Sequence, residues 1–400
     1  MSVLGIIAEY NPFHNGHLYH MSASKSSISA SKVIVVMSGN FTQRGDSAIC
    51  DKFSRTRMAL KNGADIVVEL PVFYAVSSAE YFSWAAVKLM DAMGVVTHLS
   101  FGSESGDLEQ IRLVASAMNK HRDSISWMTS ELMSDGLPYF KAREHSLSSI
   151  LHICQDFIRQ PNHILAIEYT RALEEINSSI TPVTIKREGL DHYKTASSLR
   201  QYIKTGDYPS LGEAIPDNVF FLLLGQISKY GAADISRLDN VLFYLLRTKS
   251  LDEIKSIYGM NDGVAERMVK LCGLHDSSEG FLNAVKTKRY AHTRLRRAIA
   301  HLLLDIKSEM FDQFNLTGGP RYIRVLGFRK DASQLLGEMV NKASLPVIMN
   351  LPQASDVLDE TGLLMLNKDI QSTDLYYLAC KNKNNTHGRN REYYQKIVKV

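Results

Sequence analysis

The sequence has few cysteines and no long apolar run, and each shortage excludes a class of protein. Its four cysteines, Cys50, Cys154, Cys272 and Cys380, are scattered without the close spacing of a zinc site, so we expect reduced thiols. No apolar stretch approaches the ~20 residues that span a bilayer, and the first residues lack the basic-then-apolar pattern of an export signal. These absences predict a cytoplasmic protein without a membrane contact.

Strong charge, internal repeats and low-complexity tracts are lacking as well. The formal net charge is +4 and the charged fraction is 22%, so the composition is that of a globular chain and does not by itself indicate nucleic acid. Basic residues do concentrate in the C-terminal half. A length of 400 residues predicts two to three domains.

Strand-like and helical segments alternate over the first two hundred residues. The strand-like runs are apolar and rich in β-branched residues, and the segments between them are amphipathic. This alternation predicts an α/β fold with a parallel, Rossmann-like sheet, whose ligands lie beyond the carboxyl ends of the strands. The predicted strands are 3–8, 33–37, 65–70, 95–101 and 182–186, and the predicted helices are 17–29, 54–62, 78–93, 107–120 and 162–176.

The pattern changes after residue 208. Helical periodicity dominates the next hundred residues, and Pro209 and Pro216 mark the junction. Short mixed elements follow a glycine-rich turn that ends at Pro320. We therefore predict an α/β domain over 1–208, a mainly helical domain over 209–316 and a small C-terminal α/β subdomain over 317–400.

Two histidines lie where the first predicted strand meets the first predicted helix. His14 and His17 flank Asn15 and Gly16. The first turn of a helix offers unpaired N–H groups to a phosphate, imidazoles can donate to phosphoryl oxygens, and glycine lets the backbone approach. The segment predicts ATP-dependent nucleotidyl transfer, although histidines near a turn are often only capping or surface residues.

Hydroxyl groups and an arginine follow the fifth predicted strand. Ser197 and Arg200 lie in the string 195–200, and Arg187 precedes them. Such groups at a helix start suit the β- and γ-phosphates of ATP, whereas a serine-capped helix with a surface arginine is the plain alternative. Together with the histidines, they would bracket a triphosphate.

These two strings resemble the nucleotidylyltransferase superfamily, whose members carry an HxGH motif and an SSTxIR-like motif. Further strings resemble, more narrowly, the bacterial tRNA(Met) cytidine acetate ligase family over nearly the whole chain. They are GIIAEYNPFHNGH (5–17), SGNFTQRGD (38–46), KFSRTRMAL (52–60), GADIVVELP (63–71), SFGSE (100–104), NHIL (162–165), IKR (185–187), KTKRYAHTRLRR (286–297) and YIRVLGF (322–328).

That family is understood to activate acetate with ATP, forming acetyl-adenylate and releasing pyrophosphate. The acetyl group then passes to N4 of the wobble cytidine (C34) of elongator tRNA(Met), which gives N4-acetylcytidine. The resemblance thus implies acetate and elongator tRNA(Met) as substrates and ATP with Mg²⁺ as co-substrate, without acetyl-CoA or DNA. Acetate and cytidine come from the resemblance alone, and the oligomeric state is left open.

The resemblance also assigns residues to roles. His14, His17 and Lys52 are the catalytic candidates, and no protein ligand to a metal is assigned. Gly102 would admit the adenosine, and Asn162 would contact the nucleotide or equally serve as a helix N-cap. The ATP contacts are Ile7, Ala8, Glu9, Tyr10, Asn11, Pro12, Phe13, His14, Asn15, Gly16, His17, Gly102, Asn162, Arg187, Glu188, Ser197 and Arg200.

The stretch after the second predicted strand is polar and basic. Residues 40–46 could form a lid or a recognition loop over the adenylate, with Lys52 acting in the same site. Alternatively, Lys52, Arg55 and Arg57 form the solvated face of a helix whose Met58 packs inward.

Six basic residues fall within twelve positions near residue 290, interleaved with Tyr290 and His292. They are Lys286, Lys288, Arg289, Arg294, Arg296 and Arg297. Arginines beside an aromatic at the start of a helix, here predicted at 293–304, suit RNA phosphates and stacked bases. A solvated basic face is the alternative, and the resemblance favours RNA.

One loop departs from the family pattern, because His192 and Tyr193 stand in inverted order within 188–193. This places any detailed role of the loop in doubt. Three other functions compete: a small-molecule adenylyltransferase, which leaves the basic helical half without a role; a silent RNA-binding protein, which the retained histidines and arginines oppose; and an aminoacyl-tRNA synthetase, for which no KMSKS-like string is present.

Overall fold

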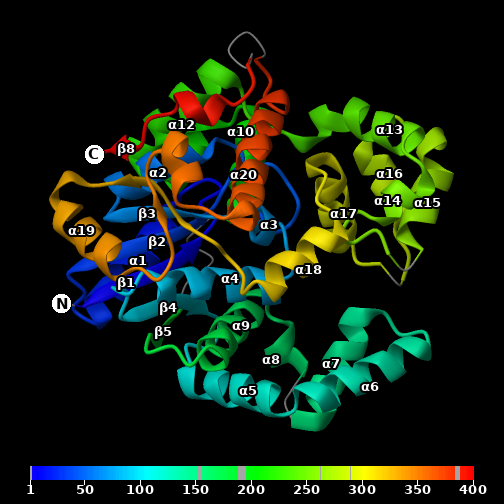
Figure 1. The fold of residues 1–400 in the computed structure, drawn as a ribbon, viewed down its shortest axis with the longest axis horizontal. Coiled ribbons are helices and arrows are strands. Elements are labelled where there is room, and N and C mark those ends of the chain that lie inside the picture. The colour runs from blue at the N-terminus through cyan, green and yellow to red at the C-terminus, as the bar shows by residue number, and fades with distance from the viewer. Residues whose placement is uncertain (1, 152–154, 188–194, 262, 289, 383–387) are drawn as a thin grey trace.

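One sheet runs through the protein, as the computed structural model shows for residues 2–151, 155–187, 195–261, 263–288, 290–382 and 388–400 (Figure 1). The strand order is β5-β4-β1-β2-β3-β6-β7, and β8 pairs with β6. The strands are β1 Val3–Ala8, β2 Lys32–Ser38, β3 Ile66–Leu70, β4 His98–Ser103, β5 Thr181–Lys186, β6 Ile323–Phe328, β7 Val347–Ile348 and β8 Val398–Lys399. Strands β1 to β5 are mutually parallel, which confirms the predicted α/β class.

The strands of the C-terminal segment extend this same sheet. Strand β6 pairs antiparallel with β3, and β7 and β8 pair parallel with β6. The described residues of 317–400 therefore share the sheet and its two core clusters with the first two hundred residues. The predicted domain boundaries along the chain stay a prediction.

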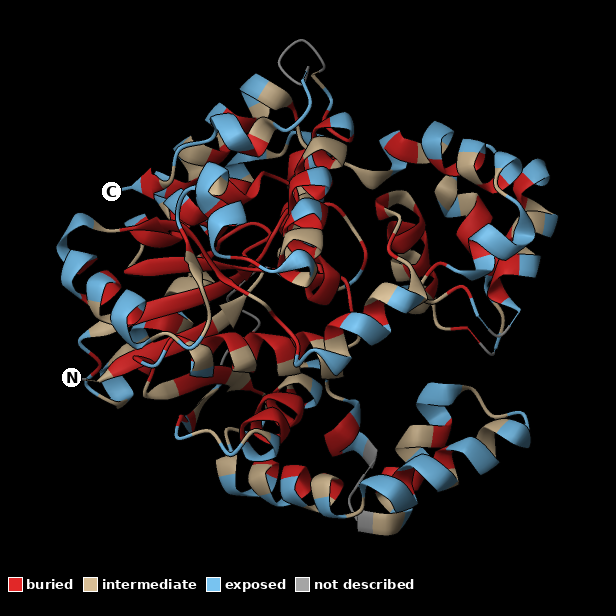
Figure 2. Cartoon of the chain, in the orientation of Figure 1, coloured by how far each residue is buried: buried red, intermediate tan, exposed pale blue. Residues whose placement is uncertain are grey.

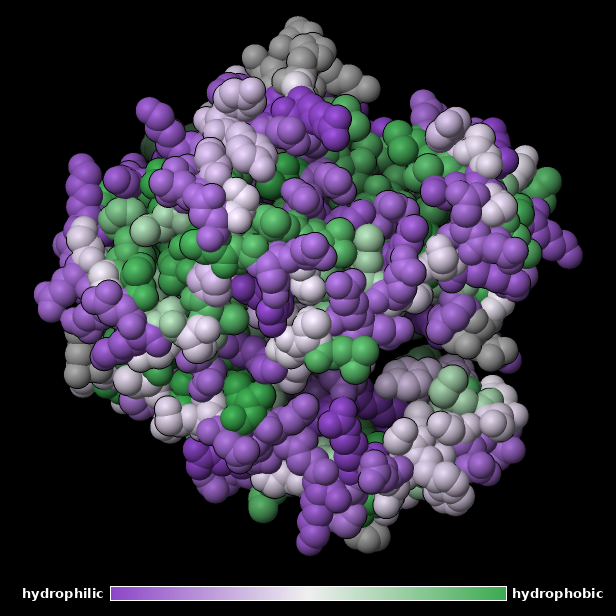
Figure 3. All heavy atoms as spheres, in the orientation of Figure 1, coloured by the Kyte–Doolittle hydropathy of each residue, from purple (hydrophilic) through white to green (hydrophobic). Residues whose placement is uncertain are grey.

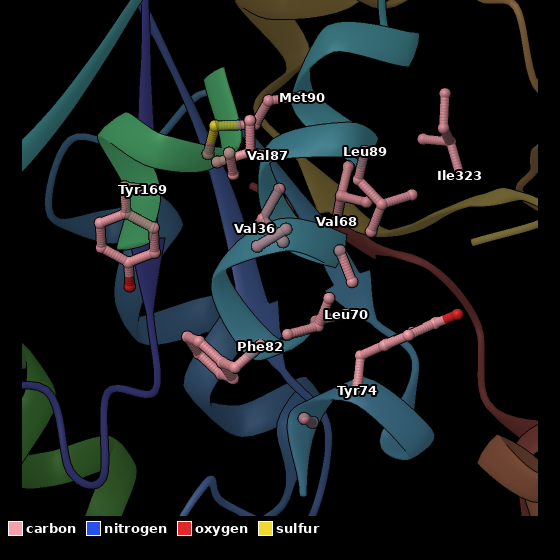
Figure 4. Close-up of a cluster of buried hydrophobic side chains, with 14 of the residues drawn as sticks. Val36, Val68, Leu70, Tyr74, Phe82, Val87, Leu89, Met90, Tyr169 and Ile323 are labelled. Atoms are coloured by element: carbon pink, nitrogen blue, oxygen red, sulfur yellow. The ribbon is translucent and has the colours of Figure 1, made fainter. Parts of the chain in front are cut away.

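Helices cover both faces of the sheet, so its strands are buried, as the red strands in Figure 2 show. Val33 and Val35 of β2 face one cluster, and Ile34 and Val36 face the other, because successive side chains point to opposite sides of a strand. Figure 4 shows the second cluster, which includes Val36, Val68 and Phe82. The helices of the sheet-bearing part are α1 Asn15–Ser27, α2 Lys52–Lys61, α3 Val72–Ala75, α4 Ala79–Ala92, α5 Leu108–Lys120, α6 Arg122–Ser134, α7 Tyr139–Leu151, α8 Gln155–Arg159, α9 Pro161–Glu175, α10 Ala196–Thr205, α19 Ser333–Lys342 and α20 Glu360–Leu378.

The part of the helical segment between residues 239 and 303 forms a lobe with a core of its own, whereas residues 208–230 and 308–316 contribute to the two clusters of the sheet. The helices after α10 are α11 Tyr208–Ala214, α12 Asp217–Tyr230, α13 Asp239–Thr248, α14 Leu251–Lys255, α15 Val264–Leu271, α16 Ser278–Val285, α17 His292–Leu304 and α18 Ser308–Leu316. Leu295 and Ile299 of α17 belong to the lobe core, whereas Ala300 and Leu304 of the same helix belong to the sheet core. Helix α17 therefore joins the two parts.

The predicted helices are present with small shifts at their ends, but two further helical units were not predicted. Helices α6 and α7 pack against each other and project from the sheet-bearing part (Figure 1). The surface is hollowed between this pair and the lobe of α13–α17 on the face drawn in Figure 3. The second unit is the long helix α20. None of the described helices is both long and apolar enough to traverse a bilayer.

Candidate functional site

The two motif histidines together form the N-terminal cap of the first helix. His14 is the N-cap of α1, with φ −144° and ψ 172°, and its Nδ1 accepts a hydrogen bond from the Gly16 amide at 3.1 Å. The Nδ1 of His17 accepts from the His14 amide at 3.3 Å, which completes a capping box. The two rings stack with their centroids 3.6 Å apart.

These hydrogen bonds also fix where the histidine protons lie. Because each Nδ1 acts as an acceptor, the proton of each neutral ring is on Nε2. Burial, reinforced by the charge of Arg187, lowers the pKa of His14 to about 4, and burial and the His14 charge lower the pKa of His17 well below its usual value. Both rings are therefore neutral near pH 7, and each retains one N–H donor.

A cavity of about 320 Å³ opens beside these rings, where β1, β4 and β5 end. We call it the histidine cavity. It lies where open α/β sheets bind ligands, and it combines apolar walls with a few polar groups, as nucleotide sites do. It is lined by Ile7, His14, Gly16, His17, Tyr19, His20, Phe101, Gly102, Asn162, Leu165, Tyr169, Ile185, Lys186, Arg187, Thr195 and Ala196.

Arg187 is aimed by a chain of side chains. Its Nη1 donates to Asn162 Oδ1 at 2.8 Å, and Asn162 Nδ2 donates to Glu104 Oε1 at 2.7 Å. Asn162 is the second residue of α9, and the N-cap of this helix is Gln160. The alternative interpretation of Asn162 as the N-cap is therefore wrong. A Cβ at Gly102 would lie 3.2 Å from Arg187 Cγ, so this glycine makes room for the arginine as well as lining the cavity.

Helix α10 begins next to the histidine cavity. Its N-cap is Thr195, whose hydroxyl accepts from the Ser198 amide at 3.2 Å, so the expected serine cap is a threonine cap. Arg200 donates from Nη1 to the Asn11 carbonyl at 2.9 Å and from Nη2 to Ser197 Oγ at 3.1 Å. Ser197 and Arg200 line a second, neighbouring cavity, whereas Thr195 lines the histidine cavity.

Residues 9–13, between β1 and the capping box, stabilise their own loop and do not line the histidine cavity. Tyr10 and Phe13 are buried and pack with ring centroids 4.8 Å apart, and Asn11 Oδ1 accepts from the Ile49 amide at 2.7 Å. The carboxylate of Glu9 accepts from the Gln43 amide at 2.7 Å, and burial raises the pKa of Glu9. Glu188, also predicted to contact ATP, lies outside the described residues, as does the loop to residue 194.

Lys52 is not brought to the histidine cavity. Its Nζ lies 2.6 Å from Glu69 Oε1 and 2.5 Å from Glu392 Oε1, and all three side chains are fully buried. Arg324 of β6 pairs with both carboxylates. Lys52 therefore lies in a buried four-residue ion cluster that joins α2, β3, β6 and the C-terminal segment.

Arg55 is buried too, so the prediction of a solvated face is wrong for it. It donates to the carbonyl of Glu9 at 2.6 Å, of Ser38 at 3.1 Å and of Cys50 at 3.0 Å. These bonds hold together the loops that follow β1 and β2. Arg57 is exposed, as the solvated-face interpretation predicts.

The basic stretch near residue 290 is divided between internal partners and the surface. Arg296 pairs with Asp46 at 3.0 Å, and Arg294 donates to Asn261 Oδ1 at 2.9 Å. Burial lowers the pKa of Arg297. Lys286 and Lys288 are exposed, and Arg289 lies outside the described residues.

The structure adds a third histidine that the motif analysis missed. His20 lines the same cavity, its Nε2 lies 3.3 Å from Ser100 Oγ, and burial, with the charge of Arg187, lowers its pKa to about 4. His14, His17 and His20 recur every three residues, which places them on one face of α1. That spacing could have indicated His20 from the sequence.

Comparison with known proteins gives consistent matches. The family model described as HIGH Nucleotidyl Transferase matches residues 1–391. The chain is 40% identical over 393 residues to the tRNA(Met) cytidine acetate ligase of Thermoanaerobacter sp. (strain X514), with 96% of each chain covered. It is 36% identical over 400 residues to the tRNA(Met) cytidine acetate ligase of Acetivibrio thermocellus, again with 96% of each covered. The structure superposes on Thermotoga maritima TmcAL bound with alpha-thio ATP with a TM-score of 0.94 at 31% identity, covering 100% of both chains.

Proposed function

The chain belongs to the HIGH nucleotidyl transferases, among the tRNA(Met) cytidine acetate ligases, and we propose from this premise that it is itself such a ligase. It activates acetate with ATP and transfers the acetyl group to N4 of the wobble cytidine (C34) of elongator tRNA(Met). We expect it to act in the cytoplasm, where tRNA and ATP are available. The observation that carries the proposal is the pair of neutral, stacked imidazoles with fixed Nε2–H donors at the histidine cavity.

In the first step an acetate oxygen attacks the α-phosphorus of ATP. A P–O bond forms, the bond between the α-phosphorus and the bridging oxygen breaks, and pyrophosphate leaves with the electron pair. Negative charge grows on the phosphoryl oxygens in the transition state, and donors that are already in place stabilise it without reorganising. His14 and His17 would supply two such donors, and Arg187 a positive charge.

The remaining ATP contacts divide by position. Ile7, Gly16, Gly102 and Asn162 line the histidine cavity with the donors. Ser197 in the first turn of α10 and Arg200 one turn later line the neighbouring cavity, where the leaving phosphates would pass. We propose no catalytic role for Lys52, because its ammonium group is enclosed by carboxylates.

Mg²⁺ would enter with the nucleotide. None of the described residues that line the histidine cavity is a carboxylate, the side chain through which proteins commonly bind Mg²⁺. Phosphate oxygens and water would hold the ion, which suits a metal that commonly binds through substrate phosphates. When bound, it would neutralise charge on the departing pyrophosphate.

In the second step the N4 amine attacks the acetyl carbonyl of the mixed anhydride. The C–N bond forms, the C–O bond to AMP breaks, and AMP leaves. The proton that the amine loses in this step passes to water. Contact with the RNA backbone would come from the exposed Lys286 and Lys288 and from the arginines of α17.

The decisive experiment incubates the purified protein with ATP, labelled acetate and bacterial tRNA that lacks acetylcytidine. We expect label in N4-acetylcytidine after digestion, dependent on ATP and independent of acetyl-CoA. Acetate-dependent exchange of pyrophosphate into ATP without labelled RNA would indicate a small-molecule adenylyltransferase instead. If neither signal appears, the proposal is wrong.

A further inference from the structure

A second cavity, of about 470 Å³, lies between the sheet-bearing part and the helical lobe. On the sheet side it is lined by the end of the 40–46 loop and by α10. On the lobe side it is lined by the start of α13, by α16 and by α17. We call it the interlobe cavity. It is larger than the histidine cavity, which has the size for one nucleotide.

The walls of the interlobe cavity combine aliphatic and polar side chains. The lobe contributes Leu242, Leu282 and Ile299 together with Asp239, Glu279 and Arg296. The sheet side contributes mainly polar groups, among them Ser197 and Arg200. An aliphatic wall suits the flat face of a nucleobase, and polar groups opposite it suit a base edge or a phosphate.

Ion pairs hold several polar groups of the interlobe cavity in place. Arg296 and Asp46 form an ion pair at the cavity, with side chains 38% and 31% exposed, so a ligand can still reach them. Gly45 also lines it, and a Cβ there would lie 2.7 Å from the backbone of Arg296, so loop and helix meet directly. Lys204 and Asp234, both in the lining, pair at 2.7 Å.

The two cavities are neighbours across the first turn of α10. Ala196 lines the histidine cavity and Arg200 lines the interlobe cavity. Four residues of helix advance by about 6 Å along its axis. Arg200 also donates to the carbonyl of Asn11, three residues before His14, so the interlobe cavity adjoins the motif loop.

The chemistry requires a second site of this kind. An enzyme that modifies the amine of a base in a stacked RNA loop must take that base out of the stack into a pocket. The histidine cavity is taken by ATP in the proposed reaction. The acceptor base therefore needs a pocket next to it, open toward the basic α17 and toward Lys286, which follows α16 directly.

We infer that the interlobe cavity receives the acceptor pyrimidine nucleotide of the RNA, with its base against the aliphatic wall and its edge toward Asp46, Ser197 and Arg200. The inference rests on the proposed function. In this position the amine of the base would reach the acetyl carbonyl beside the first turn of α10. The C–N bond then forms and the C–O bond to AMP breaks, as above. Because Ser197 and Arg200 would serve the leaving pyrophosphate in the first step and the base edge in the second, the two ligands occupy this site in turn.

A blocking substitution tests the site by activity. Gln201 is exposed on α10 and lines the interlobe cavity, whereas Thr205 is exposed one turn later and lines neither cavity described. We expect Gln201→Trp to lower acetyl transfer to tRNA about a hundredfold more than it lowers acetate-dependent pyrophosphate exchange. Thr205→Trp should change both rates equally and little. Equal loss of both activities in Gln201→Trp would assign the cavity to ATP or pyrophosphate and overturn the inference.

A cross-link tests the site without activity. The probe is an anticodon stem–loop RNA with 5-iodocytidine at the acceptor position, irradiated with the wild-type protein and mapped by peptide sequencing. We expect cross-links in 45–49, 197–204, 235–242, 278–282 or 296–303, the segments that line the cavity, and cross-links confined to other segments would overturn the inference. Failure of the proposed function would look different, because the wild-type protein would then show no acetate-dependent exchange whatever the cross-link map.

Discussion

The histidine cavity and the basic stretch 286–297 both offer hydrogen-bond donors to an anion, but they hold them differently. In the cavity the donors are neutral, buried and fixed by a capping box within α1. In the basic stretch they are charged: Lys286 and Lys288 are exposed, whereas Arg296 and Arg294 are engaged with Asp46 and Asn261. Fixed neutral donors stabilise a transition state, whereas exposed charges contribute an attraction that salt can screen.

The largest effect is expected from His14→Asn. Asparagine is a good N-cap, so α1 keeps its cap while one Nε2–H donor is lost. Removal of one such donor costs about 10²–10³ in rate, so acetate-dependent pyrophosphate exchange should fall by that factor. Affinity for tRNA should stay the same. The control is His145→Asn on the exposed surface of α7, and a loss below about threefold would contradict the role of His14.

Arg187→Lys should have the next largest effect. Lysine keeps the charge but loses the planar fork that Asn162 aims, so the KM for ATP should rise about tenfold or more with a smaller change in kcat. Steady-state kinetics measures both constants. A matched control is Arg57→Lys, an exposed arginine on α2. An equal response of the two variants would remove Arg187 from the nucleotide site.

Acid should lower the free energy of unfolding through the buried histidines of the cavity. In the unfolded chain the imidazoles take up protons near their ordinary pKa of 6.5, whereas in the folded chain His14 and His20 resist protonation until about 4. Stability is therefore fully present above about pH 6.5 and falls toward pH 4, by at most about 1.4 kcal/mol per pH unit for each histidine. Urea unfolding at several pH values measures this slope, and His14→Asn should make it shallower.

The smallest effect is expected from Lys286→Ala/Lys288→Ala. The loss of two exposed cations should weaken tRNA binding about threefold to tenfold. It should also reduce the slope of log K against log salt concentration by roughly 0.7–0.9 per phosphate contact. Arg296→Ala should change the slope less, because its charge is already paired with Asp46. Binding titrations at several salt concentrations test both. A larger slope change for Arg296 would show that RNA displaces Asp46.

Patterns within short stretches of sequence predict the parallel strands and the position of the histidine motif. Strands β1 to β5 follow from apolar, β-branched runs, and the histidine motif follows from its place between β1 and α1. His14, His17 and Arg187 meet at one cavity because carboxyl ends of parallel strands share an edge of the sheet.

The rest depends on partners that are far apart in the chain. The position of Lys52 is set by Glu392, and that of Arg296 by Asp46, and no local pattern links either pair. The antiparallel pairing of β6 with β3 is equally remote. Spacing in sequence cannot indicate which buried charges will meet, so it does not predict the ion cluster around Lys52 or the burial of Arg55.

The capping box has a consequence for calorimetry. Because both motif imidazoles are already neutral with their protons on Nε2, neither has to take up or release a proton when the triphosphate arrives. The heat of ATP binding near pH 8 should therefore be the same in buffers with very different ionisation enthalpies. A protein that used imidazolium at this position would instead draw protons from the buffer, and its binding heat would follow the buffer chosen.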